Sequence, residues 1–334
     1  MPRQKRLNIP GTIFHVIARG IERRSIFMDS EDYEDFLQRL GSGLEKTKSR
    51  CYAWALMPNH FHLLVRCSEL PLSDLMRRIM GSYAGYFNRR HRRAGHLFQN
   101  RYKSILCQED VYFLELVRYI HLNPVRAGMI RKMAELDQFP WTGHGALVGK
   151  RKNDWQSRGE VLERFGQRER TAVVGYRKYI EDGWNMGKRQ DLVGGGLRRS
   201  AGGWEGVRAL KREGDVWQSD ARILGDGGFV SEVLDAADEK LSLKEDLKRE
   251  GWTLEKIIDR SCAEVGIAPG DIYRKGRGNA IATAKGLFSY WAAEQMGISR
   301  KIVAQRLGVS QQAVSQSIQA GRQFCIEKSI NLTS

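Results

Sequence analysis

The chain has 334 residues and a formal net charge of +16, which comes from 55 Lys and Arg against 39 Asp and Glu. This length allows two or three domains, each with its own hydrophobic core. The composition, 41% hydrophobic and 28% charged, is typical of a soluble globular protein. No apolar run approaches the roughly 18–20 residues that a membrane helix needs, so we expect no membrane segment. The basic excess favours a polyanionic partner, and nucleic acid is the usual one.

The five cysteines, at positions 51, 67, 107, 262 and 325, are scattered and form no CxxC pair. This spacing argues against a zinc ribbon or a disulfide framework and favours a reducing compartment. The N-terminal residues are basic, but no apolar signal core follows them. We therefore expect a cytoplasmic protein.

Strand and helix patterns alternate over the first 145 residues. Thr12–Ala18 is β-branched and apolar, as in a buried strand. Cys51–Met57 and Phe61–Val65 are two further strand-like runs, and the Pro-Asn pair between them predicts a hairpin. Amphipathic helical spacing is found in three segments: Asp29–Leu44, Leu72–Phe87 and Val111–Leu122. This order predicts an α+β domain over residues 1–145, with an antiparallel sheet and helices packed on it.

The rest of the chain divides into two predicted segments. Residues 146–240 have weaker patterns, interrupted by Gly194–Gly196 and Ser200–Gly203, and are interpreted as a connector with local helices. Residues 241–334 become helical again and are predicted to form an all-α domain.

The stretch at 57–66 reads MPNHFHLLVR and places two histidines on one predicted strand. Alternate side chains of a strand share a face, so His60 and His62 point together. Neutral imidazole is the commonest metal ligand, and the pair could hold one divalent ion. The short motif alone is weak, because two polar residues on the solvent face of an edge strand would give the same pattern.

The helix at 111–122 presents a tyrosine and leads into an asparagine. Tyr119 and Asn123 are four residues apart and share a face. The opposite stripe, expected to pack on the sheet, consists of Phe113, Leu116, Val117 and Ile120. Pro124 biases Asn123 out of helical geometry, so its amide is expected to be free to bind a metal. Tyr119 is thus a candidate nucleophile, although half-buried packing is the alternative interpretation, and Tyr112 is its rival.

Several motifs in the same order resemble one known family. The runs TIFHVIARG, MPNHFHLLV, GHLFQNRYKS and RYIHLNPVRAG resemble the REP-associated tyrosine transposases, within the wider class of HUH single-strand transposases. The resemblance covers about 130–145 residues. It implies that Tyr119 is the nucleophile and that His60, His62 and Asn123 are ligands of a catalytic Mg²⁺ or Mn²⁺. It also implies a bacterial cytosolic protein.

The implied chemistry is DNA strand transfer through a covalent intermediate. A tyrosine hydroxyl, with a pKa of about 10, is a weak nucleophile at neutral pH, and a metal on the scissile phosphate would assist its attack. The product would be a 5′-phosphotyrosine and a free 3′-hydroxyl, made without ATP. In agreement, the sequence has no GxxxxGK[ST] phosphate loop.

A basic segment precedes the tyrosine helix. The cations that we expect to contact the phosphates of single-stranded or hairpin DNA are Arg89, Arg90, Arg92, Arg93, Arg101 and Lys103. His91, His96, Phe98 and Tyr102 are interleaved with them and are expected to meet bases. A solvated charge run is the alternative interpretation.

The C-terminal residues predict a helix-turn-helix that would bind duplex DNA. Ser299 begins one helix, Gly308-Val309 makes the turn, and Ser310 begins a second helix from Gln311 to Ala320. The positions expected to be buried are Ile302, Val303, Leu307, Val309, Val314 and Ile318. Those expected to read base edges are Gln311, Gln312, Ser315, Gln316 and Gln319. Residues 257–321 also resemble the DNA-binding domain of the bacterial chromosomal replication initiator, which implies that Arg274, Lys275 and Arg277 contact phosphates.

Three functions fit these patterns. The first is a metal-dependent transposase that cleaves and rejoins single-stranded DNA at repetitive, hairpin-forming elements. The second is a catalytically silent DNA-binding regulator of such elements. The third is a replication or plasmid relaxase, which shares the chemistry but has a different motif order. The sequence does not reveal the DNA target or the oligomeric state.

Overall fold

The computed structural model describes residues 7, 9–68, 70–187, 189, 192, 220, 222–274 and 280–332. The chain divides into two compact units, Met1–Val233 and Leu234–Ser334. Helix α11 (Gly227–Arg249) begins in the first unit and continues in the second. Among the described residues, no helix has the length and apolar character required to span a bilayer.

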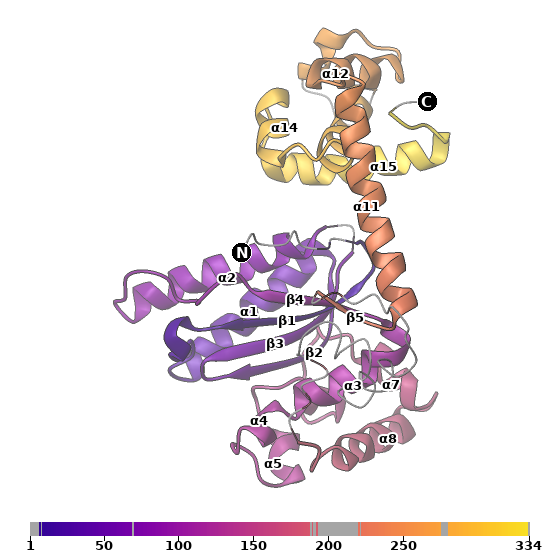
Figure 1. Cartoon of the computed structure of the whole chain (residues 1–334). Coiled ribbons are helices and arrows are strands. Elements are labelled where there is room, and N and C mark those ends of the chain that lie inside the picture. The colour runs from indigo at the N-terminus through magenta and orange to yellow at the C-terminus, as the bar shows by residue number, and fades with distance from the viewer. Residues whose placement is uncertain are drawn as a thin grey trace. The chain divides into compact units, whose positions relative to one another are not determined.

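The first unit is built on a five-stranded sheet with the order β2-β3-β1-β4-β5 (Figure 1). Its strands are β1 (Ile13–Arg19), β2 (Arg50–Met57), β3 (His60–Arg66), β4 (Lys103–Cys107) and β5 (Ile223–Leu224). The first four are joined by antiparallel pairs, whereas β5 pairs with β4 in parallel. The predicted α+β class is confirmed, but the sheet is mixed, because a segment more than 100 residues beyond β4 returns to extend its edge.

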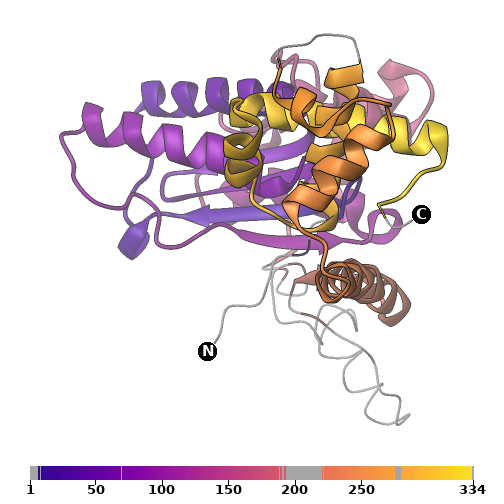
Figure 2. The ribbon, with the colours of Figure 1, turned by 90° about the horizontal axis from the view of Figure 1, so that it is seen from above.

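Two helices cover one face of the sheet. Helices α1 (Ser30–Thr47) and α2 (Leu72–Arg90) run side by side across it (Figure 2). Phe36 of α1 packs on Phe61 of β3, with ring centroids 4.8 Å apart. Tyr83 of α2 meets Phe36 edge-on at 5.1 Å. The apolar positions that predicted these helices are therefore the ones that bind them to the sheet.

The opposite face is covered by α3 (Glu109–His121) and the helices that follow it (Figure 1). These are α4 (Asn123–Arg126), α5 (Met133–Gln138), α6 (His144–Leu147), α7 (Arg158–Leu162) and α8 (Glu169–Asp182). The predicted stripe of α3 is buried here, together with Ile13, Leu64 and Ile105 of the strands. Helices α7 and α8 contribute Val161, Tyr176 and Ile180 to the same core. The first part of the predicted connector is thus packed into the sheet domain.

A buried chain of polar groups ties four of these helices together. His144 Nε2 of α6 donates to Asp137 Oδ1 of α5 at 2.9 Å, and Arg177 Nε of α8 donates to Asp137 Oδ2 at 3.1 Å. The Tyr176 hydroxyl lies 2.8 Å from His144 Nδ1 and 2.8 Å from His121 Nδ1 of α3. With His144 Nε2 as donor, the hydroxyl donates to His144 and accepts from His121. The network fixes the helix that carries Tyr119.

The network predicts that acid destabilises the first unit. Burial lowers the pKa of His144 despite its bond to Asp137. As the pH falls through about 6.5, position 144 takes up a proton in the unfolded chain but not in the fold, which costs up to about 1.4 kcal/mol per pH unit. We expect the free energy of unfolding in urea to depend less steeply on pH between 7 and 5 in His144→Gln than in the unchanged protein. At pH 7 this free energy should be lower in the variant. A slope equal to that of the unchanged protein would contradict this assignment.

The second unit is helical. After α11 come α12 (Leu254–Ala263), α13 (Ala280–Tyr290), a π-helical turn (Trp291–Gln295), α14 (Arg300–Leu307) and α15 (Gln311–Lys328). Ser299 and Ser310 cap the last two helices by accepting from the backbone N–H groups of Ile302 and Ala313. Gly308 takes the turn between them with a φ of 65°. The predicted helix-turn-helix geometry is present, and its second helix is longer than expected.

The helix-turn-helix core departs from the prediction at two positions. Val303, Leu307, Val314 and Ile318 are buried, as expected. Ile302 is 46% exposed, because it lies in the first turn of α14 on the side away from the core. Val309 is only partly buried against that core.

Candidate active site

The register of the sheet brings the two histidines of the HFH motif to the face covered by α3. In the β1–β3 pair, His62 lies opposite Ile17 and His60 opposite Arg19. The two imidazole centroids are 5.1 Å apart. His62 is buried, with 4% exposure, and His60 is partly exposed. The pair thus lies at the start of β3, with one ring inside the domain and one near its surface.

Each histidine has a partner that can fix its tautomer. His60 Nδ1 donates to Asn59 Oδ1 at 2.7 Å, which leaves the lone pair on Nε2. His62 Nδ1 lies 3.0 Å from Nε2 of His15, a fully buried residue of β1. When His62 Nδ1 donates, its Nε2 also keeps a lone pair. Second partners of this kind orient imidazoles that bind metals.

The surroundings keep both rings neutral at pH 7. Burial lowers the pKa of His60 to about 4, with a smaller effect from the Arg19 cation. Burial also places the pKa of His62 well below its ordinary value, and His15, His60, Arg19 and Arg126 lower it further. Neutral imidazole is the form that binds metal ions.

Helix α3 places Tyr119 against these histidines. The Tyr119 ring meets His62 edge-on at a centroid distance of 5.9 Å, and His15 at 5.8 Å. Tyr119 is only partly buried against the core. Its rival Tyr112, on the same helix, is likewise partly buried against the core. The structure therefore brings together Tyr119 and the two histidines that the sequence pattern singled out.

Asn123 begins α4, directly after the helix that carries Tyr119. Its amide nitrogen donates to the carbonyl oxygens of Tyr119 at 3.0 Å and Ile120 at 3.2 Å. The expectation that Asn123 leaves helical geometry with its whole amide free is therefore wrong, because Asn123 is the first residue of α4 and its amide nitrogen closes the last turn of α3. Metal binding at this position would use Asn123 Oδ1.

The donor atoms fit a divalent ion bound by few protein ligands. Two imidazole nitrogens with lone pairs and one amide oxygen are neutral donors, and solvent or phosphate oxygens would complete the coordination. In the part of the chain that the structure describes, no group of three or more His, Cys, Asp or Glu side chains is arranged to hold a metal. Any metal here therefore depends on Asn123 Oδ1 and on oxygen atoms from outside the chain.

The predicted cations of the basic segment divide into two groups. Arg89, Arg92, Arg101 and Lys103 are exposed, and Lys103 lies opposite Ile17 at the start of β4. Arg93 instead lies over the Phe87 ring at 5.7 Å. The interleaved aromatic residues also differ from the prediction, since Tyr102 is buried and Phe98 packs edge-on against Phe61 at 6.2 Å. Both contribute to the fold, whereas His96 is exposed.

Arg90 does not have the predicted role. Its guanidinium donates to Asp29, Glu31 and the fully buried Asp32, at 2.8–3.0 Å. His91 lies 2.9 Å from the same Asp32 carboxylate. These bonds hold the end of α2 against the first turn of α1. The positive charge of Arg90 is therefore balanced by three carboxylates and not directed at a DNA phosphate.

In the second unit, α15 presents the predicted base-reading residues. Gln311, Gln312, Gln316 and Gln319 are exposed. Ser315 is partly buried, and its hydroxyl donates to the Gln311 carbonyl at 3.0 Å. Arg274 is exposed and pairs with Asp271 at 3.0 Å. Lys275 and Arg277 lie outside the described residues.

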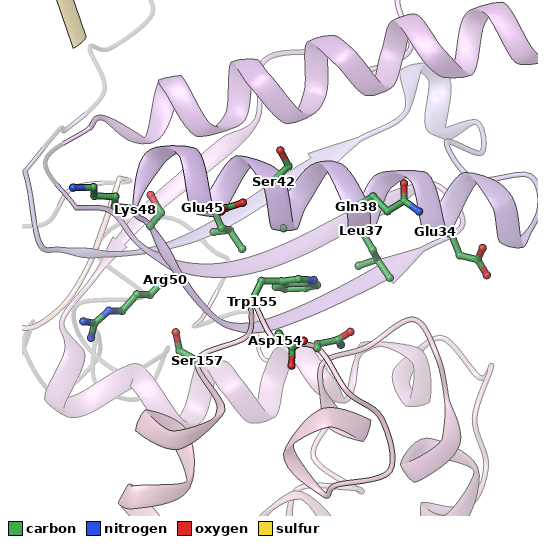
Figure 3. Close-up of a pocket in the computed structure, with 14 residues that line it drawn as sticks. Glu34, Leu37, Gln38, Ser42, Glu45, Lys48, Arg50, Asp154, Trp155 and Ser157 are labelled. Atoms are coloured by element: carbon green, nitrogen blue, oxygen red, sulfur yellow. The ribbon is translucent and has the colours of Figure 1, made fainter. Parts of the chain in front are cut away.

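A large pocket lies elsewhere on the first unit. It has a volume of about 980 Å³ and opens between α1 and residues 153–157 (Figure 3). The Trp155 indole lies along α1 there because Gly41 has no Cβ, an atom that would come 2.7 Å from Trp155 Cδ1. Its charged lining residues are Glu34, Glu45, Asp154, Lys48 and Arg50. Three carboxylates against two cations do not favour a polyanion, and none of the histidine-site residues lines this pocket.

Part of the chain is similar to known proteins. Residues 8–123 match the family described as IS200-like transposases. This segment, 116 of the 334 residues, includes β1, the HFH strand, Tyr119 and Asn123. A solved structure of a REP-associated tyrosine transposase bound to a REP hairpin is similar at 16% identity and a TM-score of 0.39. The similarity covers 47% of this chain and 98% of that one. No curated protein matches the chain.

Sequence reasoning missed two residues of this site, His15 and Arg126. His15 stands between Phe14 and Val16 in the strand run, where alternation would have placed it on the His62 face. Arg126 follows Asn123 by three residues, and its guanidinium lies over the Tyr119 ring at 4.8 Å. The alternation along β1 was a usable signal for His15, whereas the position of Arg126 depends on the tight turn into α4.

Proposed function

We propose that this protein is a metal-dependent transposase that cleaves and rejoins single-stranded DNA at repetitive, hairpin-forming elements. The observation that carries the proposal is the contact of Tyr119 with His62, beside a second histidine that has an available nitrogen. Tyr119 is proposed as the nucleophile. His60 Nε2, His62 Nε2 and Asn123 Oδ1 would hold a divalent ion.

The proposed step exchanges one phosphodiester bond for another. The Tyr119 oxygen attacks phosphorus, the bond from phosphorus to the 3′-oxygen breaks, and the phenolic proton is lost while the leaving 3′-oxygen gains one. A bound Mg²⁺ or Mn²⁺ would offset negative charge developing on the phosphate. Tyr119 is kept beside this position by α3 and by its edge contacts with His15 and His62.

The second unit is proposed to bind duplex DNA. Its support is the capped pair α14–α15 and the exposed glutamines along the first turns of α15, which can reach base edges in a major groove. A chain with both activities would recognise DNA at one unit and cut it at the other.

Replacing the nucleophile tests the proposal directly. The full chain is incubated with Mn²⁺ or Mg²⁺ and labelled DNA that carries a hairpin with single-stranded flanks. We expect a covalent adduct that survives denaturing electrophoresis, which Tyr119→Phe abolishes and Tyr112→Phe retains.

An adduct that persists in Tyr119→Phe would reject this nucleophile. If the unchanged protein binds the hairpin but forms no adduct with any of a set of varied flanks, the silent regulator is the better description.

A further inference from the structure

Arg126 is held against the proposed nucleophile by three contacts. Its Nη1 donates to the Tyr119 carbonyl oxygen at 2.7 Å, and its Nε donates to the Met186 carbonyl oxygen at 3.4 Å. Its Cζ lies 4.8 Å from the centroid of the Tyr119 ring. The guanidinium is thus fixed in orientation over the face of this ring, whose edge contacts lead to His15 and His62.

The charge of Arg126 is not balanced by a carboxylate. Among the residues that the structure describes, no Asp or Glu pairs with it. Its neighbours differ, because Arg118 and Arg189 both pair with Glu115. Arg126 is partly buried, and burial together with these neighbouring cations lowers the pKa of its guanidinium. A partly buried cation without a counter-ion is costly, and an anion bound there would remove much of that cost.

We propose that Arg126 is a phosphate-binding residue that holds the scissile phosphodiester of DNA against Tyr119. This inference rests on the proposed function of the site. A guanidinium presents planar N–H groups that match two phosphate oxygens, and the two carbonyl bonds leave such groups available. After attack, the same group would hold the phosphate now bonded to Tyr119.

The first test is kinetic and uses the full chain. Under single-turnover conditions with saturating hairpin DNA, we expect Arg126→Met to slow adduct formation by about 10²- to 10³-fold. Arg126→Lys retains the positive charge but not the planar set of N–H donors, so its rate of adduct formation should fall less than that of Arg126→Met. The matched control is Arg131→Gln, an exposed cation five residues along the chain, which should react like the unchanged protein. Equal rates for Arg126→Met and the unchanged protein would overturn the inference while leaving the nucleophile in place.

The second test does not depend on activity. Dimethyl phosphate, a phosphodiester monoanion, is titrated into the full chain, and the Nε–H resonance of Arg126 is followed by NMR after assignment with Arg126→Lys. We expect a saturable shift that sodium chloride at equal ionic strength does not produce. If the resonance shifts but the protein forms no covalent adduct with DNA, the proposed function is rejected while Arg126 remains an anion-binding residue. The absence of a shift would show that Arg126 only supports the turn, even if Arg126→Met is unstable.

Discussion

Replacing His62 with alanine is expected to slow DNA cleavage by about 10³-fold or more, since the substitution removes a proposed metal ligand and the edge contact with the Tyr119 ring. The same loss should follow removal of divalent ions with a chelator, and added Mn²⁺ should restore the unchanged protein but not the variant. Single-turnover adduct formation and isothermal titration with Mn²⁺ measure the two effects separately.

His96→Ala is the matched control for this prediction. His96 lies in the basic segment and is exposed, so its loss should leave Mn²⁺ binding unchanged, and any lost contact with a base should not slow cleavage at saturating DNA. Cleavage by His62→Ala at the rate of the control, or full activity in the presence of a chelator, would contradict a metal at this pair. Either result would mean that Tyr119 attacks DNA without a bound metal.

Gly321→Ala is expected to destabilise the second unit by about 3 kcal/mol or more, a typical upper value for forcing atoms into a packed core. In this unit α13 and α15 cross at two glycines. A Cβ at position 321 would lie 2.0 Å from the Gly286 carbonyl oxygen and 2.7 Å from the Leu287 nitrogen. Both obstacles are backbone atoms and cannot rotate away. Helix α15, which carries the predicted base-reading residues, would have to move off α13.

Thermal melting of the full chain, followed by circular dichroism, measures this effect. The control is Gly270→Ala in the same unit, where a Cβ would meet nothing within 4 Å. We expect the control to melt like the unchanged protein, and Gly321→Ala to lose duplex binding while its covalent chemistry at Tyr119 persists. Unchanged melting of Gly321→Ala would show that the two helices are not packed as closely as described.

Short-range periodicity predicted much of the first unit. The two-residue repeat of β3 placed His60 and His62 on one face, and the helical repeat of α3 separated Tyr119 from the stripe that enters the core. Both inferences needed only the geometry of one element. The family resemblance then connected the two elements, which periodicity alone does not do.

The features that were missed depend on residues far apart in the sequence. Arg90 was expected to face DNA because its own segment is basic, yet its partners are carboxylates about 60 positions earlier, at the start of α1. Strand β5 joins β4 from more than 100 residues further along the chain. Helices α7 and α8 looked like a connector because their apolar positions are few, although Tyr176 is fully buried. Such pairings have no local signature.

The central claim is that Tyr119 becomes covalently joined to DNA. The most direct measurement is mass spectrometry of the protein digested after reaction with hairpin DNA and Mn²⁺. Our account predicts a nucleotide attached to the peptide that contains Tyr119, through its phenolic oxygen. A nucleotide on the peptide of Tyr112 or on any other residue would contradict it.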